Sequence, residues 1–147
     1  RYRMKLSFLL WLASVLPQPA ADQLCLATTV YLEARSESRI GQMAVAVVAM
    51  RRRENGRWGD TVCDVVRSPG QFALSTTRAS YMIANPKAWQ KAWQVADRAI
   101  TMWSLPASRR QFVVPDADHF ILADATSYWA KGAPVATIGA HNFYRIN

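Results

Sequence analysis

Apolar positions recur at helical spacing in two segments of the first half of the chain. The first predicted helix begins at Asp22 or Gln23 and ends near Arg35. A second, strongly apolar helix follows the N-cap candidates at positions 36–38 and ends in the basic run 51–53. Two consecutive helices with a short corner between them are therefore predicted, and Glu33 lies in the last turn of the first.

The second half changes from loops to a third helix and then to extended pieces. Asn-Gly, Gly-Asp and Pro-Gly breakers surround a short apolar turn at 62–66. Asn85 followed by Pro86 predicts the start of a helix that reaches Trp103. Extended stretches are predicted at 111–114, 120–122 and 140–144. The pattern predicts a mainly α (α+β) fold, with a few short strands in a compact single domain.

The first twenty-one residues have the pattern of a targeting segment. Basic residues at positions 1, 3 and 5 precede an uncharged apolar run, Leu6 to Leu16, and small residues follow at Ala20 and Ala21. Eleven apolar residues rise only about 16 Å as a helix, roughly half of a bilayer core. We therefore predict a signal peptide or N-terminal anchor at 1–21 and a mature domain at 22–147. A buried first helix is the alternative, because the leucines and Trp11 would also suit a core.

Composition and charge narrow the class of protein. A hydrophobic fraction of 51% with 19% charged residues excludes general disorder, and 147 residues suit one core. Removal of residues 1–21 would leave 15 basic and 10 acidic residues, a net charge of +5. Such a domain favours polyanions: nucleic acid, anionic lipid or the acidic polymers of a bacterial envelope. Export favours the envelope, so nucleic acid is not expected as a partner.

The two cysteines, Cys25 and Cys63, leave two readings open. In an oxidising periplasm they could form a disulfide that closes a loop of roughly forty residues and contributes about 3–4 kcal/mol. They could equally be two unrelated buried thiols, because the sequence does not give their separation.

A zinc site is one alternative for the chemistry. His119 and His141 with Glu33 or Glu37 could form a two-histidine, one-carboxylate site, the basis for a metal-dependent amidase. The H-E-x-x-H spacing is missing, and so is the G-x-S-x-G motif of serine hydrolases. We therefore predict no metal and no cofactor.

Several motifs resemble those of the SleB-type cell-wall hydrolases, which include spore cortex-lytic enzymes. The resemblance covers nearly all of the chain after Asp22, and its motifs occur in the family's order. They are Leu26-Ala27, Tyr31-Leu32-Glu33-Ala34-Arg35, Gly41-Gln42, Val45 to Val48, Thr61 to Val66, Gln71-Phe72, Asp118-His119-Phe120, Trp129 and Ile138-Gly139-x-His141-x-Phe143-Tyr144. In two places the chain departs from the family: Met50 replaces an asparagine and Ser36 replaces the glycine of E-A-R-G-E.

The resemblance implies a lysozyme-like helical domain in which Glu33 is the catalytic acid. Cleavage of a glycosidic bond needs a protonated acid beside the leaving oxygen, and an apolar surround would raise the pKa of Glu33 enough to provide one. Pairing with Arg35 or Arg39 would instead lower that pKa. None of the other carboxylates has a motif spacing that marks it as a partner. This favours a lytic transglycosylase, in which the C6 hydroxyl of the muramic residue attacks the anomeric carbon and leaves a 1,6-anhydromuramoyl end.

Substrate contacts are predicted on loops and near the C-terminus. Aromatic side chains beside chain breakers can stack on sugars, and polar ones can orient the N-acetyl groups or the glutamate. The aromatic candidates for stacking are Phe72, Tyr128 and Trp129, and the cleft positions that the family resemblance implies are Gln71, Tyr128, His141 and Tyr144. The function expected is cleavage of the MurNAc-GlcNAc bond of peptidoglycan by an exported monomer in the periplasm or cell envelope, associated with the envelope or membrane through its N-terminal segment. The alternatives are the amidase and a non-catalytic wall-binding module.

Overall fold

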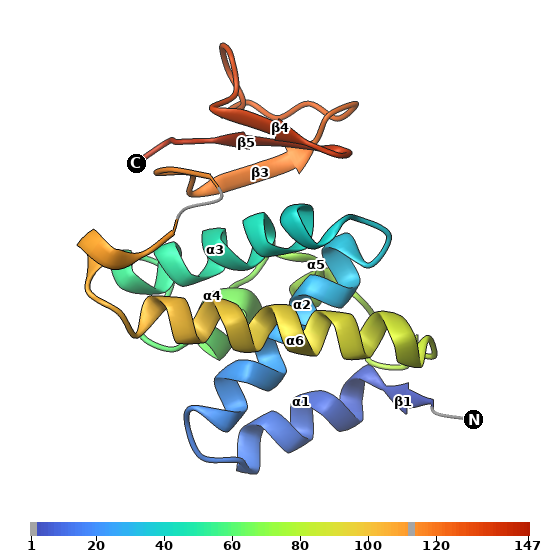
Figure 1. The fold of residues 1–147 in the computed structure, drawn as a ribbon. Coiled ribbons are helices and arrows are strands. Elements are labelled where there is room, and N and C mark those ends of the chain that lie inside the picture. The colour runs from blue at the N-terminus through green and yellow to red at the C-terminus, as the bar shows by residue number, and fades with distance from the viewer. Residues whose placement is uncertain (1–2, 112–113) are drawn as a thin grey trace.

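The computed structural model of the protein describes residues 3–111 and 114–147. Figure 1 shows helices in the N-terminal two thirds and a small sheet, stacked beyond α3, in the C-terminal third. The helices are α1 (Leu6–Val15), α2 (Ala20–Ala34), α3 (Arg39–Asn55), α4 (Val62–Arg67), α5 (Ala73–Thr76) and α6 (Pro86–Trp103), with a 3-10 turn at Ala107–Arg109. The strands are β1 (Met4–Lys5), β2 (Met82–Ile83), β3 (His119–Leu122), β4 (Ala136–Ile138) and β5 (His141–Tyr144).

The mainly α prediction is confirmed, and the helix starts have the predicted caps. The Ser38 side chain accepts a hydrogen bond from the Gly41 amide, and the Asn85 side chain accepts one from the Ala88 amide. Helix α3 ends at Asn55 and is followed by Gly56, whose φ of 82° suits the left-handed C-cap. Helices α2 and α3 pack against α6 and supply most of the core, since nearly every α3 position from Gly41 to Met50 is buried.

Helix α4 is attached to α2 by a covalent bond and by a hydrogen bond. Cys25 and Cys63 form a disulfide with their Cα atoms 5.3 Å apart, which resolves the two readings of the sequence. The Asp22 carboxylate accepts a hydrogen bond from the Val62 amide at 3.1 Å. The first turns of α2 and the start of α4 are therefore fixed together. The segment that follows α4, which contains α5 and β2, leaves from this fixed point.

The N-terminal segment packs on the helical domain in this structure. Strand β1 pairs with β2, and α1 lies against α2 with Leu6 and Leu9 buried while Trp11 is 56% exposed. Two of the leucines are thus buried, as in the buried-helix alternative, but Trp11 does not join the core. The predicted cleavage site near Ala20 or Ala21 falls in the first turn of α2. Among the described residues, no helix has the length and apolar character to span a bilayer.

The C-terminal strands form an antiparallel sheet with the order β3-β5-β4. Its register pairs Phe120 with Phe143 and Leu122 with His141, and Phe143 is fully buried. Two of the three predicted extended stretches thus become β3 and β5. Strand β4 was not predicted, and the predicted stretch 111–114 includes residues 112 and 113, which lie outside the described part of the chain.

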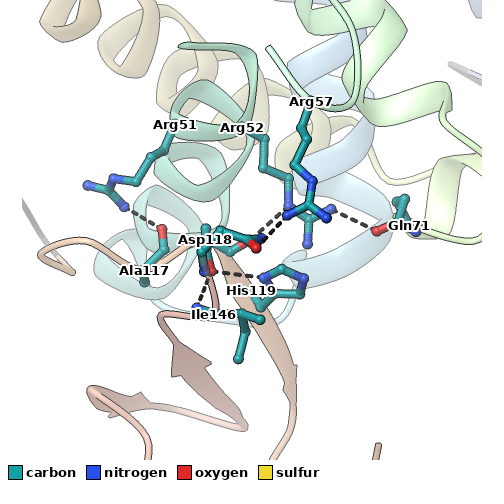
Figure 2. Close-up of polar contacts among 9 residues, drawn as sticks. Arg51, Arg52, Arg57, Gln71, Ala117, Asp118, His119 and Ile146 are labelled. Carbon is teal, nitrogen blue, oxygen red and sulfur yellow. Dashed lines mark hydrogen bonds and ion pairs between the residues drawn. The ribbon is translucent and has the colours of Figure 1, made fainter. Parts of the chain in front are cut away.

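Two consecutive arginines near the end of α3 hold the chain that leads into the sheet. Figure 2 shows Arg51 donating to the Ala117 carbonyl and Arg52 donating to the Asp118 carbonyl, the latter through Nε at 2.7 Å. The basic run 51–53 at the end of α3 is therefore not simply exposed to solvent, as charged residues at a helix end usually are. Its two inward members bind backbone oxygens of the neighbouring layer and set where β3 begins.

Candidate active site

Glu33 lies half-buried in the last turn of α2. Its Oε2 accepts a hydrogen bond from the Ala73 amide, at the start of α5, at 2.7 Å. Burial raises the pKa of Glu33, and the Ala73 amide and the Arg52 charge only partly offset this effect. The surroundings of the side chain thus favour the protonated carboxyl group more than water does.

The ion pairs that would have lowered the pKa of Glu33 are not formed among the described residues. The Arg35 guanidinium lies over the Tyr31 ring, 5.2 Å from its centre. Arg39 donates to the Gln94 side chain at 3.0 Å. Both neighbouring arginines are therefore engaged elsewhere, and the reading of Glu33 as one half of a helix-end ion pair does not describe this structure.

Arg52 is a site residue that the sequence reasoning missed. It is only 3% exposed, and its guanidinium lies over the rings of Trp58 and Phe72, at 4.6 and 5.0 Å from their centres. Burial lowers the pKa of Arg52 to about 10, against the opposing charges of Asp118 and Glu33. Even so, it stays charged at neutral pH and places a fixed cation near the carboxyl of Glu33. Only its position within the basic run 51–53 could have indicated it.

A cavity of about 580 Å³ lies between the helices and the sheet at this point. Arg52 forms part of its wall and donates to the Gln71 side chain at 3.1 Å, as Figure 2 shows. The cavity is lined by Arg52, Arg57, Trp58, Gly70, Gln71, His119, Phe120, Ser127, Tyr128, Trp129, Ile146 and Asn147. Three of the predicted substrate residues, Gln71, Tyr128 and Trp129, are thus brought together. Gln71 is two residues before Ala73, the hydrogen-bond partner of Glu33.

The other predicted substrate residues lie behind this surface. Phe72 is 2% exposed and packs against Phe120, with ring centres 5.8 Å apart. Tyr144 is also buried and meets the Trp129 ring edge-on at 5.6 Å. His141 is buried beside Phe120, and burial lowers its pKa against the opposing charge of Glu37. In this structure these three side chains support the wall of the cavity.

The two histidines do not meet, which bears on the zinc alternative. The register pairs His119 with Tyr144 but His141 with Leu122, so the two lie three positions apart along the pairing, about 10 Å. Because successive side chains of a strand alternate between the two faces of a sheet, a separation of three positions also places the two histidines on opposite faces. Among residues 3–111 and 114–147, no three His, Cys, Asp or Glu side chains gather as a metal would require.

Glu37, four residues after Glu33, fastens the turn between β4 and β5 to the helices. Its Oε1 accepts a hydrogen bond from the Ala140 amide at 3.2 Å, and its backbone carbonyl accepts one from Lys91 at 2.7 Å. Gly139 precedes Ala140 with φ of 56°, and a Cβ built there would lie 1.9 Å from Glu37 Oε1. A glycine at 139 therefore lets this carboxylate reach the turn.

Comparison with known proteins gives the family of this chain. The sequence model of the Cell Wall Hydrolase family matches residues 36–144. The chain belongs to the Cell Wall Hydrolase family. The match begins three residues after Glu33, so this glutamate lies just outside the matched segment, while Gln71, His119 and Trp129 lie inside it.

Relatives and a solved structure of this family agree with that placement. The spore cortex-lytic enzymes of Bacillus subtilis and Oceanobacillus iheyensis are each 33% identical over 119 residues, or 80% of this chain. The aligned region is 35% and 39% of those proteins, so the chain spans well under half of the relatives it matches. The catalytic domain of the germination-specific lytic transglycosylase SleB from Bacillus anthracis has a TM-score of 0.67 and 27% identity, covering 88% of this chain and all of that domain.

The two departures from the family pattern lie in different surroundings. Met50 is fully buried in the core, where a thioether packs as an asparagine amide could not without polar partners. Ser36 is exposed at the corner between α2 and α3. Neither residue lines the cavity beside Arg52.

Proposed function

We propose that this chain cleaves the MurNAc-GlcNAc glycosidic bond of peptidoglycan as a lytic transglycosylase, with Glu33 as its acid and then its base. The observation that carries the proposal is the state of Glu33: half-buried, free of ion pairs among the described residues, and with a raised pKa. Membership of the Cell Wall Hydrolase family and similarity to the catalytic domain of a lytic transglycosylase support the substrate class.

The proposed reaction needs one carboxyl group. Glu33 gives its proton to the bridging oxygen while the bond from that oxygen to C1 of the muramic residue breaks. The C6 hydroxyl of the same residue then bonds to C1, and Glu33 takes the hydroxyl proton, which restores the acid. The products are a free GlcNAc hydroxyl end and a 1,6-anhydromuramoyl end, and no water is consumed.

The surroundings of Glu33 favour this route over hydrolysis with two carboxylates. A hydrolase would place a second carboxylate beside the sugar to activate water or to act as nucleophile. Among the described residues, the one charged group that shifts the pKa of Glu33 is a cation, Arg52. The Glu37 carboxylate is bonded to the Ala140 amide, and that of Asp118 accepts three hydrogen bonds. Both are engaged in holding the sheet.

Substitution of Glu33 tests the acid and the product together. Glu33→Gln keeps an acceptor for the Ala73 amide but has no proton to give, so release of muropeptides from purified sacculi should fall on the order of a thousandfold. Glu54→Gln is the matched control, since it makes the same change at a glutamate that is 52% exposed and pairs with Arg110. Mass spectrometry of the wild-type products should show anhydromuramoyl ends. Full activity of Glu33→Gln would refute the role of Glu33, and reducing ends that have gained water would refute transglycosylation.

We further propose that the protein is exported and acts as a monomer in the periplasm or envelope. The Cys25–Cys63 disulfide supports an oxidising compartment. Residues 1–21 are proposed as the signal peptide or anchor that directs export. N-terminal sequencing of the protein from envelope and periplasmic fractions distinguishes cleavage near Ala21 from retention, and its mass in solution tests the monomer. A protein found only in the cytoplasm would contradict export.

When retained, the N-terminal segment offers a surface for a membrane. Helix α1 exposes Phe8, Trp11 and Val15 at 48%, 56% and 58%, next to the basic residues Arg3 and Lys5. Apolar and aromatic side chains beside positive charges suit an anionic bilayer surface. We propose that α1 rests there. Sedimentation with anionic vesicles should decrease when Phe8 and Trp11 are replaced by serine and remain unchanged for Leu105→Ser, an exposed apolar residue elsewhere.

A further inference from the structure

A histidine with a fixed hydrogen-bonding state lies in the wall of the cavity described above. His119 begins β3, and its side chain is 12% exposed. Its ring lies 4.8 Å from the Trp129 ring and 5.9 Å from the Trp58 ring, measured between centres. The two tryptophans hold the plane of the imidazole, so its nitrogens point in set directions.

The orientation of this ring is also set by the Asp118 carboxylate, which is itself held by two backbone amides. Asp118 accepts hydrogen bonds from His119 Nδ1, the Ile146 amide and the Asn147 amide, each at 2.8 Å. Burial acts to raise the pKa of Asp118, but these three hydrogen bonds outweigh it and the pKa is lowered. Figure 2 shows the carboxylate between the ring and the C-terminal backbone. An ionised Asp118 can only accept, so the hydrogen on His119 is at Nδ1.

With its hydrogen at Nδ1, a neutral His119 carries a lone pair at Nε2. Burial and the charges of Arg52 and Arg57 lower the pKa of His119, against the opposing effect of Asp118. The ring is therefore neutral at pH 7. Among the described residues, no hydrogen-bond donor meets Nε2, and the ring borders the cavity.

The rest of this wall is rich in hydrogen-bond donors, so an acceptor such as His119 Nε2 can make a contact that the two arginines there cannot. Arg52 and Arg57 present guanidinium groups, and the Gln71 carbonyl oxygen is already bonded to Arg52. A saccharide presents hydroxyl hydrogens around its rim and an apolar face that packs on an aromatic ring. His119 Nε2 beside Trp129 matches that combination.

We propose that His119, held by Asp118, is a substrate-binding residue of this cavity, whose Nε2 accepts a hydrogen bond from a hydroxyl of a peptidoglycan sugar packed on Trp129. This inference rests on the proposed function, because it takes the glycan strand as the ligand. It assigns His119 a role in binding and none in bond cleavage, which stays with Glu33.

Binding measured in the Glu33→Gln background separates the two proposals. The probe is a soluble GlcNAc-MurNAc oligosaccharide, and the readout is calorimetric affinity at pH 7.5. His119→Ala should weaken binding about two- to tenfold, the range for one hydrogen bond. His119→Gln should recover most of the affinity, since its amide oxygen can take the place of Nε2. Circular dichroism and thermal unfolding of each variant check that the fold is kept.

A pH series adds a readout that a purely structural role would not change. Protonation of Nε2 turns the acceptor into a donor, so affinity should fall as the pH drops through the pKa of His119, below its ordinary value of 6.5. His119→Gln should lose that dependence. The other charged groups facing the ring are Asp118, Arg52 and Arg57. They and His141 are present in both proteins, so the comparison isolates residue 119.

The outcomes are distinct. Weaker binding in His119→Ala, recovery in His119→Gln and loss of the pH dependence in the glutamine variant together support the inference. Equal affinity of all three proteins, or a pH dependence that persists in His119→Gln, overturns it while leaving the role of Glu33 intact. Absence of binding in Glu33→Gln, together with failure of the wild-type protein to cleave sacculi, overturns the proposed function itself.

Discussion

The helical body, residues 20–103, and the sheet layer, residues 117–144, are held in place by different forces. In the helical body, α2 and α3 bury rows of alanine and valine against α6, and the Cys25–Cys63 disulfide joins α2 to α4. The sheet layer buries Phe143, but its attachment also depends on long side chains that bind backbone atoms: Arg52 to the Asp118 carbonyl and Glu37 to the Ala140 amide.

This difference matters because the candidate site draws on both parts. The helical body supplies the proposed acid, Glu33, and the cation, Arg52. The sheet layer supplies His119 and, in the loop after β3, Trp129. A loss of apolar packing or of the disulfide should therefore lower stability with little change in the cleft. A loss of the polar attachments should alter the cleft at a smaller cost in stability.

Removal of the disulfide should give the largest change in stability. Replacing both Cys25 and Cys63 by alanine frees a loop with a sequence separation of 38 residues, and the free energy of unfolding should fall by about 3–4 kcal/mol. Activity on sacculi at 25 °C should stay within about twofold, because Glu33 lies two turns further along α2. Urea unfolding and muropeptide release measure the two effects.

Reductant provides the control for this prediction. Reduced wild-type protein should unfold at nearly the same urea concentration as the double alanine variant, and the variant itself should not respond to reductant. A variant that keeps its stability but loses activity would reverse the assignment, since the disulfide would then act on the cleft and not on the helical body.

The same contrast explains how much could be predicted from the sequence. The bounds of α3 and α6 followed from apolar periodicity and from the caps Ser38 and Asn85, because local spacing determines which face of a helix is buried. Strand β4 was missed because three residues carry too little pattern. Its place depends on pairing with β5, which is a tertiary contact.

Prediction of the candidate site divided along similar lines. The family resemblance pointed to Glu33 and Gln71, and the position of aromatic side chains beside breakers and polar groups pointed to Tyr128 and Trp129. Gln71, Tyr128 and Trp129 do meet at one cavity. Arg52 was missed because a basic residue at a helix end is ordinarily solvated, and nothing local shows that it turns inward. Its burial depends on Trp58 and Phe72 lying on either side of the guanidinium, which only the fold brings about.

Gly139→Ala should lower the stability of the protein by an intermediate amount, because it disturbs the attachment of the sheet layer. The new Cβ would lie 1.9 Å from Glu37 Oε1, so the flexible carboxylate must move and lose the Ala140 amide, and φ of 56° adds backbone strain. Gly132→Ala has similar strain, with φ of 74°, but no atom within 4 Å. We expect stability losses of about 2 kcal/mol for Gly139→Ala and about 1 kcal/mol for Gly132→Ala.

A double-mutant cycle isolates the Glu37 contact from the strain. In a Glu37→Ala background the carboxylate is gone, so Gly139→Ala should cost only about as much as Gly132→Ala does. Activity should fall with Gly139→Ala and with Glu37→Ala but not with Gly132→Ala. Additive stability losses would mean that Glu37 does not fasten the turn, and the sheet layer would then be held without it.

The smallest expected change in stability comes from Glu33→Gln, and it is an increase. Because the pKa of Glu33 is raised, the folded protein holds this proton more tightly than the unfolded chain, whose pKa is near 4.5. The stability that comes from the proton is complete below about pH 4.5 and is lost as the pH rises through the folded pKa.

Glu33→Gln cannot lose a proton, so its stability relative to wild type should rise over that interval and exceed that of wild type at pH 7, although the enzyme is inactive. Urea midpoints at pH 4 and pH 7 measure this. Glu54→Gln removes a half-exposed carboxylate from its ion pair with the largely buried Arg110 side chain, so it should show no such gain. A Glu33→Gln protein that is less stable than wild type at pH 7 would mean that the carboxylate is stabilised where it lies, and a carboxylate stabilised in that way could not serve as the acid.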